Sequence, residues 1–198
     1  RCSPANDLHA TNDSNLFVDD INAHHVTNHR NISQFQFDSE IEPFAYCDLL
    51  PVQKYLQSQR VTTVGRPSSP FSIRSNTWAL DASTHPVKHA RLALRGPVHS
   101  SNTRKVWCAL LPENTVTTNN VTTLVFDSDD RILQGYVMGV LNSGVIDWYG
   151  HLKINLYLNF FILYTIPVPV YVQENPTCTR IAELARRLSI VPGLKYGN

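Results

Sequence analysis

The clearest pattern in the chain is a strict alternation of apolar and polar positions over residues 152–160. A period of two places successive side chains on opposite faces of a strand, whereas a helix would distribute them around its axis. The segment therefore predicts a strand with one aliphatic face. The apolar set consists of Leu152, Ile154, Leu156, Leu158 and Phe160.

Residues that favour strands concentrate in further segments after residue 60, with Gly, Pro, Asn and Asp between them. No helical pattern alternates with these segments, so the rhythm of a parallel βαβ sheet is missing. About eight strands of this kind predict an all-β fold, an eight-stranded antiparallel jelly-roll sandwich with one or two short helices and extended termini. Besides 152–160, the segments are 61–64, 71–80, 87–95, 105–111, 121–126, 132–141 and 168–172.

Two segments show helical spacing instead. Residues 48–60 begin with Asp48 as a candidate cap, have Pro51 in the first turn and repeat apolar side chains at helical intervals. Residues 177–189 have an apolar stripe at i, i+3, i+4 and i+7, between Pro176 and Pro192. We therefore expect one short helix before the strands and one helix after them.

The composition divides the chain into three regions. Residues 1–32 are rich in Asn, Asp, Ser, Thr and His, which predicts an extended polar N-terminal arm. Residues 33–176 would form the jelly-roll domain, and residues 177–198 the C-terminal helix and tail. The first residue is Arg1 rather than Met, and no apolar signal segment follows it, which favours release from a longer precursor.

The 198 residues include 17 basic and 16 acidic side chains, and the charged fraction is only 17%. Interfaces between proteins exclude charged side chains, so this low fraction favours assembly with other subunits. Basic side chains are nevertheless concentrated in two places, residues 51–110 and the C-terminal region. Arg180, Arg186, Arg187 and Lys195 are the candidate contacts to RNA phosphate, independent of sequence. Arg91, Arg95, Arg104 and Lys105 are weaker candidates.

Candidate metal sites have little support in the sequence. His25 and His29, like His85 and His89, are four residues apart, but neither pair lies in a convincing helix, because Pro86 interrupts the second pair and Asp81 does not complete it. The acidic run at Asp127, Asp129 and Asp130 lacks the spacing of a calcium loop and is explained by a hairpin turn. The four cysteines form no CxxC pair. We expect no metal, no cofactor and no catalytic residues, since no nucleophile or phosphate-loop motif is present.

Residues 90–96 (ARLALRG) and 106–111 (VWCALL) resemble the central strands of the small coat proteins of picorna-like plant viruses, the comovirus, fabavirus and cheravirus group. The resemblance extends over residues 70–172 and rests on pattern. It implies a single jelly-roll cut from a polyprotein, which joins other capsid subunits of the same virion in an icosahedral shell around an RNA genome. The protein would then be located in the virion, and in the host cytoplasm during assembly, without a membrane span.

Two other functions remain open. A secreted jelly-roll or lectin-like module would bind carbohydrate through Trp148 and Tyr149 on a turn at residues 147–150. Such a module would carry glycans at the sequons of Asn12, Asn31 or Asn120 and would pair its cysteines. The third alternative, a β-sandwich hydrolase, has no residue that can be nominated for catalysis.

Overall fold

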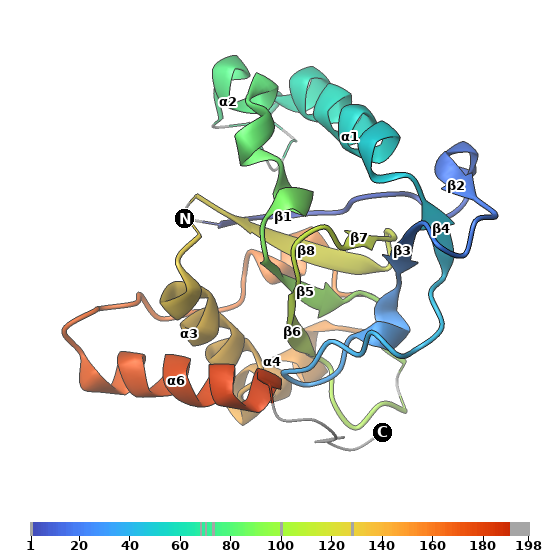
Figure 1. The fold of residues 1–198 in the computed structure, drawn as a ribbon. Helices are drawn as coiled ribbons and strands as arrows, with labels where there is room; N and C mark the ends of the chain where they lie inside the picture. Colours follow the sequence, from blue (N-terminus) through green and yellow to red (C-terminus); the bar gives the residue numbers. More distant parts are fainter. Residues whose placement is uncertain are drawn as a thin grey trace.

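The computed structural model describes residues 2–67, 69, 71–72, 74–99, 101–127 and 129–190, which form two small sheets and several helices. The first sheet has the order β1-β8-β5-β6, and all its pairs are antiparallel. It runs through the centre of the molecule in Figure 1. Its strands are β1 (Cys2–Ala5), β8 (Val121–Phe126), β5 (Arg91–Arg95) and β6 (Cys108–Leu111).

The second sheet is smaller and has the order β2-β4-β3-β7. Its last pair, β3 with β7, is parallel, unlike a jelly-roll in which neighbouring strands are antiparallel. Each of its strands has at most four residues. They are β2 (Phe17–Val18), β4 (Ala45–Cys47), β3 (His24–Thr27) and β7 (Val116–Thr117).

Helices lie on opposite sides of the molecule in Figure 1, with the first sheet between them. On one side lie α1 and α2, and on the other side α3 and α6 pack against each other. The described helices are α1 (Leu49–Thr63), α2 (Asn76–Leu80), α3 (Arg131–Leu141), α4 (Gly144–Lys153), α5 (Phe160–Leu163) and α6 (Pro176–Ile190). Single turns of 3-10 helix occur at η1 (Ser14–Leu16), η2 (His29–Asn31), η3 (Ala82–Thr84) and η4 (Pro86–Lys88).

The all-β jelly-roll prediction is therefore wrong. Helices account for more of the described residues than strands do, and the two sheets do not form an eight-stranded antiparallel sandwich. Both predicted helices are present as α1 and α6. The predicted strands within 87–95, 105–111 and 121–126 are present as β5, β6 and β8.

Residues 132–141 form most of α3 rather than a strand. The Asp130 carboxylate accepts hydrogen bonds from the backbone N–H groups of Ile132 and Leu133, so Asp130 caps this helix instead of forming a hairpin turn. Two glycines of α3 let α6 approach closely: a Cβ on Gly139 would lie 2.6 Å from Ile181 Cγ2, and one on Gly135 would lie 2.9 Å from the Ala182 carbonyl oxygen. The helix is therefore selected by its packing as well as by its cap.

The predicted strand at 152–160 is also wrong. Its first two residues end α4, Phe160 begins α5, and the backbone of Leu156 and Leu158 bonds instead to Val98 and Gly96. The aliphatic side chains do not share one face. Ile154 and Leu158 are buried, whereas Leu152 is 61% and Leu156 59% exposed. The alternation in the sequence thus extends across three different local structures.

The remaining strand predictions fail for local reasons. Residues 61–63 continue α1, and Asn76–Leu80 form α2 with the Ser75 hydroxyl as cap. Residues 168–172 contain no strand.

The predicted N-terminal arm, residues 1–32, forms part of both sheets over its described portion. β1 pairs with β8, β3 pairs with β4 and β7, and Leu8, Val26 and Ile32 are buried. Few apolar residues are enough to anchor this segment, because its backbone makes the ladder hydrogen bonds. The predicted tail after α6, residues 191–198, lies outside the described residues.

Candidate functional site: an apolar face and two polar cavities

Helix α4 buries one polar side chain, Asp147, beside Ile146 and Gly150, and it exposes large apolar side chains as well as His151 and Lys153. The Asp147 carboxylate accepts hydrogen bonds from the backbone N–H groups of Lys105 at 2.7 Å and Val106 at 3.3 Å. Gly150 lies against the same segment, where a Cβ would be 2.9 Å from the Cβ of Lys105. Trp148, on the opposite side, is 64% exposed. Surface helices normally bury large apolar side chains of this kind.

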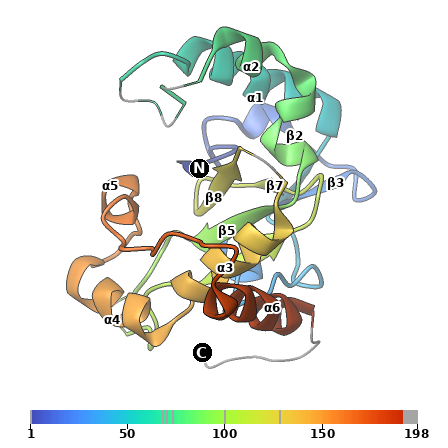
Figure 2. The ribbon, with the colours of Figure 1, turned by 90° about the vertical axis from the view of Figure 1, so that its left-hand side faces the viewer.

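Helix α5 and the chain leading to it extend this surface. The Tyr149 hydroxyl donates to Thr165 Oγ1 at 2.9 Å, which ties the end of α5 to α4. In Figure 2 both helices lie on one side of the molecule, away from α1 and α2. We define the α4–α5 face as the exposed apolar side chains Val145, Trp148, Leu152, Leu156, Tyr157, Phe161 and Tyr164.

The α4–α5 face is large and almost uncharged. It contains seven exposed apolar side chains, and large exposed apolar patches mark contact sites. Between residues 144 and 172 the sequence contains Asp147 and Lys153 as its formal charges, and Asp147 points inward. A surface of this kind is typical of a protein–protein contact.

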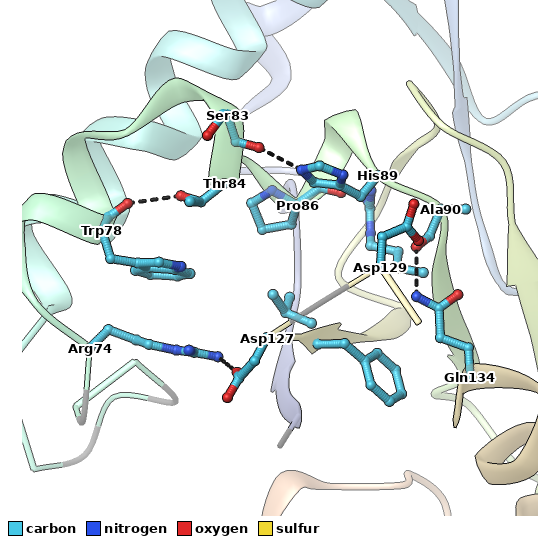
Figure 3. A pocket seen from close by; sticks show the side chains of 13 residues that line it. Arg74, Trp78, Ser83, Thr84, Pro86, His89, Ala90, Asp127, Asp129 and Gln134 are labelled. Carbon is cyan, nitrogen blue, oxygen red and sulfur yellow. Dashed lines mark hydrogen bonds and ion pairs between the residues drawn. The ribbon is translucent and has the colours of Figure 1, made fainter. Parts of the chain in front are cut away.

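A first cavity, of about 270 Å³, lies between α2 and the end of β8 (Figure 3). Arg74 forms an ion pair with Asp127 and lies over the Trp78 ring at 4.9 Å from its centroid. On the other wall, His89 Nε2 is 2.5 Å from the Ser83 carbonyl oxygen. The charged groups of this cavity are thus engaged with each other or with the backbone.

A second cavity, of about 330 Å³, lies between α1 and the N-terminal segment. Its wall includes Arg60 and His85, which are 3% and 2% exposed. Burial is the main cause that lowers the pKa of Arg60 to about 10 and the pKa of His85 to about 4; for His85 the cations Arg60 and Arg91 lower it further. The same wall contains Asp7 and Asp13.

The structure brings together two of the four predicted RNA contacts. Arg186 and Arg187 line one cavity with Arg131 of α3, and that cavity measures about 460 Å³. Arg180 lies elsewhere on α6 and faces Glu183 at 3.5 Å. Lys195 lies outside the described residues. Because Arg131 already pairs with Glu113 and Asp129, the excess of positive charge here is small, and RNA contact stays a prediction.

The weaker basic candidates have internal partners. Arg91 is buried and pairs with Asp7, and its guanidinium also donates to the carbonyl oxygens of Pro86 and Thr115. Lys105 is buried and donates to the His99 carbonyl oxygen at 2.6 Å. Arg95 lies 4.6 Å from the Trp107 ring centroid, and Arg104 donates to the Asn142 carbonyl oxygen at 2.8 Å. These cations hold the fold together.

The histidines and aspartates considered for metal binding are separated or otherwise used. Within the described ranges, no group of three His, Cys, Asp or Glu side chains could hold a metal ion. The ring of His25 packs edge-on against Tyr46, while the pKa of His29 is lowered by burial and, after that, by Arg95. Asp81 accepts a hydrogen bond from the backbone N–H of Ser83 at 2.8 Å and begins η3.

Several features on which the carbohydrate-binding prediction was based are not found in the structure. Trp148 and Tyr149 lie within α4 and not on a turn. The Asn31 side chain is buried and donates to the carbonyl oxygens of Asp38 and Ile41, so the folded protein does not present it for glycosylation. Cys47, Cys108 and Cys178 are buried and form no disulfide with another described residue, and burial is the main cause that raises the pKa of Cys47 to about 11.

No family model matches the chain, and no curated protein matches it. Among the described helices, none combines the length and the apolar character needed to cross a membrane.

The sequence pattern did not predict the α4–α5 face, because residues 132–141 and 152–160 were predicted as strands, with a turn at residues 147–150 between them. The structure uses Ser143 as the cap of α4, where its hydroxyl accepts a hydrogen bond from the Ile146 N–H at 3.3 Å. A serine three residues before an apolar position was the available signal. No comparable signal identifies the second cavity, whose walls come from distant segments.

Proposed function

We propose that this protein functions as an assembly subunit, whose α4–α5 face is buried against a second copy of the same chain. The observation that carries the proposal is the group of large apolar side chains that α4 exposes. Its polar Asp147 is satisfied inside, and its exposed side presents Val145, Trp148 and Leu152 to the surroundings. Covering these side chains removes apolar surface from water, at about 25 cal/mol for each Å².

The neutrality of the face favours a second copy as the occupant. In an isologous contact the same surface patch meets itself, so a face with an excess of one sign of charge repels its copy, whereas a nearly neutral face does not. Lys153 is the formal charge beside this face, and it stands at the end of α4.

An icosahedral virus coat is the specific assembly that the sequence predicted, and it stays a prediction. The jelly-roll on which it depended is not the fold of this chain, so the support that remains is the low charge and the α4–α5 face. Carbohydrate binding also stays a prediction, without the turn on which it was based.

The test compares the mass of the assembly in solution for three proteins by light scattering after size exclusion. We expect a dimer or larger assembly for the unaltered chain and a monomer for the double variant Trp148→Glu, Phe161→Glu. The matched control is Ile21→Glu with Leu80→Glu, two exposed apolar residues outside the face that are 71% and 63% exposed. It should assemble like the unaltered chain.

Circular dichroism of the three proteins checks that each is folded. A monomeric unaltered chain at high concentration, or equal loss of assembly in the control, would refute the proposal. Electron microscopy of the assembled material then distinguishes small oligomers from spherical particles of uniform diameter, which would support the coat prediction.

A further inference from the structure

The chain between α5 and α6 crosses the surface without belonging to a sheet. Residues 167–172 (PVPVYV) form neither helix nor strand, and we call them the 167–172 strap. In Figure 2 this part of the chain runs from α5 across α3 toward α6. Proline fixes φ at about −65° and restricts the residue before it to extended conformations. Pro167 and Pro169 therefore favour an extended strap.

One backbone edge of the strap faces its own chain. The Tyr136 hydroxyl of α3 donates to the Pro169 carbonyl oxygen at 3.2 Å, and the ring of Tyr171 packs against the Tyr136 ring with 5.3 Å between their centroids. In an extended chain the N–H and C=O groups of every second residue point to the same edge. Residues 167, 169 and 171 therefore share the inner edge, and two of these three are prolines, which have no N–H group to donate.

The outer edge, formed by Val168, Val170 and Val172, has free backbone groups. The N–H groups of Val170 and Val172 and the carbonyl oxygens of Val168 and Val170 form no hydrogen bond with any residue that the structure describes. Two groups of this edge are used inside the chain: the Val168 N–H donates to the Ile166 carbonyl oxygen at 2.9 Å, and the Val172 carbonyl oxygen accepts from the Asn175 N–H at 3.0 Å. Val170 itself is 83% exposed.

This division into free and used groups fits an antiparallel copy of the same strap. When two straps meet about a two-fold axis at Val170, each Val170 exchanges both hydrogen bonds with its symmetry mate. The Val172 N–H then donates to the Val168 carbonyl oxygen of the other copy. Every free group of the outer edge is used in this way. The groups that the chain already uses, the Val168 N–H and the Val172 carbonyl oxygen, are each other's partners in the same register.

The side chains of the strap also favour a second copy as the occupant. Valine, a β-branched residue, packs well in strands. Exposed strand edges are normally protected by charged side chains, but residues 154–173 contain no Asp, Glu, Lys or Arg. Two copies of the strap therefore meet without repulsion between like charges.

We propose that the 167–172 strap pairs with the strap of a second copy as an antiparallel two-stranded ribbon with its centre at Val170. The inference rests on the proposed function, because so few hydrogen bonds between short strands do not hold a dimer by themselves. The strap begins three residues after Tyr164, the last residue of the α4–α5 face. The face supplies the apolar contact, and the strap fixes the register of the two copies.

Amide hydrogen exchange, followed by NMR on the unaltered chain below and above the concentration at which it assembles, tests this pairing. We expect the N–H groups of Val170 and Val172 to exchange at least tenfold more slowly in the assembly, because both become hydrogen-bonded. The N–H of Tyr171, on the inner edge, should exchange at the same rate at both concentrations. Burial of the strap without pairing would not produce this alternation.

Variants at the centre of the strap test the same pairing by light scattering. Val170→Pro removes the central N–H from both copies and should raise the dissociation constant of the assembly at least tenfold, whereas Val170→Ala, which keeps the N–H, should have a smaller effect. The matched control is Gln173→Pro. Gln173 is the second residue of the turn closed by the Asn175 N–H, a position that proline favours, so assembly should be unchanged.

A cysteine at the centre tests the register. The Cα atoms of such a pair lie about 5.5 Å apart, within the range of a disulfide, so Val170→Cys should form a cross-linked dimer on mild oxidation. Ile21→Cys, at a position that is 71% exposed outside the strap, should not.

The possible failures are distinguishable. A monomeric unaltered chain would overturn both the proposed function and the strap pairing. Assembly of the unaltered chain with no slowing of exchange at Val170 and Val172, or with no cross-link in Val170→Cys, would overturn the strap pairing alone. Undiminished assembly of Val170→Pro would do the same, and the exchange and cross-linking results decide the question even if that variant does not fold.

Discussion

The α3–α6 pair and the α4–α5 face differ in what covers their apolar side chains. Where α3 meets α6, glycine and alanine line the contact, and the backbones approach so closely that a Cβ on Gly135 or Gly139 has no room. On α4, Gly150 and Asp147 face the core, and Trp148 faces outward. The first surface is complete within the chain, whereas the second has the composition of an interface that another molecule completes.

This comparison predicts that the largest loss of stability comes from filling the α3–α6 contact. Gly139→Leu places atoms where Ile181 Cγ2 and Ala185 Cβ already lie, at 2.6 and 3.3 Å from the first added atom. We expect the free energy of unfolding to fall by about 3 kcal/mol. Urea denaturation measures this change, and an unchanged midpoint would mean that the two helices are not packed as described.

We expect a low pH to destabilise the fold through His85, which belongs neither to the α3–α6 contact nor to the α4–α5 face. Burial, Arg60 and Arg91 lower the pKa of His85 to about 4, while its value in the unfolded chain is 6.5. The unfolded state therefore binds the proton first, and stability is present above pH 6.5 and lost as the pH falls toward 4. The loss is up to about 3 kcal/mol. Urea denaturation over this pH range should show it.

The control for this prediction is His85→Gln, which cannot be protonated. In this variant the free energy of unfolding should change less between pH 6.5 and pH 4, although its value at neutral pH is lower. His29, whose pKa is also lowered, contributes to both proteins and cancels in the comparison. An identical pH dependence in the two proteins would show that His85 is not buried.

A smaller change in stability is expected to distinguish Gly135, which has close neighbours, from Gly144, which has none within 4 Å. Gly135→Ala gains about 1 kcal/mol of helix propensity, but its methyl group meets the Ala182 carbonyl oxygen at 2.9 Å, so we expect a net loss of about 1–2 kcal/mol. Gly144→Ala, at the start of α4, has no atom within 4 Å and should be neutral or stabilise slightly. Thermal unfolding of both variants measures the difference, and equal shifts would contradict the tight contact.

The smallest effect on the isolated chain is expected at the α4–α5 face itself. Trp148→Glu replaces a side chain that is mostly exposed, so the free energy of unfolding of the monomer should change by no more than about 0.5 kcal/mol. Urea denaturation at a concentration too low for assembly tests this. A large loss would mean that Trp148 belongs to the core of its own chain.

Sequence reasoning predicted the elements whose local signals agree with their packing. β5, β6 and β8 are rich in aliphatic side chains and centrally buried, and α6 has an apolar stripe between prolines. Residues 132–141 were misinterpreted because β-branched and aromatic residues favour strands. Their helical spacing at Leu133, Tyr136, Val137 and Val140, with Asp130 as cap, was present in the sequence.

The alternation at 152–160 failed for a different reason, because tertiary contacts divided it. The Asp147 carboxylate anchors α4 to Lys105 and Val106, and the backbone of Leu156 and Leu158 bonds to residues 96–98. Neither contact is visible in a local pattern, since the partners are about fifty residues away in the sequence. For the same reason the α4–α5 face and the second cavity could not be predicted.

The most direct test of the central claim, that a second copy covers the α4–α5 face, is oxidative footprinting of side chains over a range of protein concentrations. The rate of oxidation of Trp148, Phe161 and Tyr164 should fall several-fold as the concentration rises, while Phe44, which is 43% exposed outside this face, should react at a constant rate. Constant reactivity of Trp148 and Phe161 at every concentration, or protection of Phe44 instead, would contradict the account.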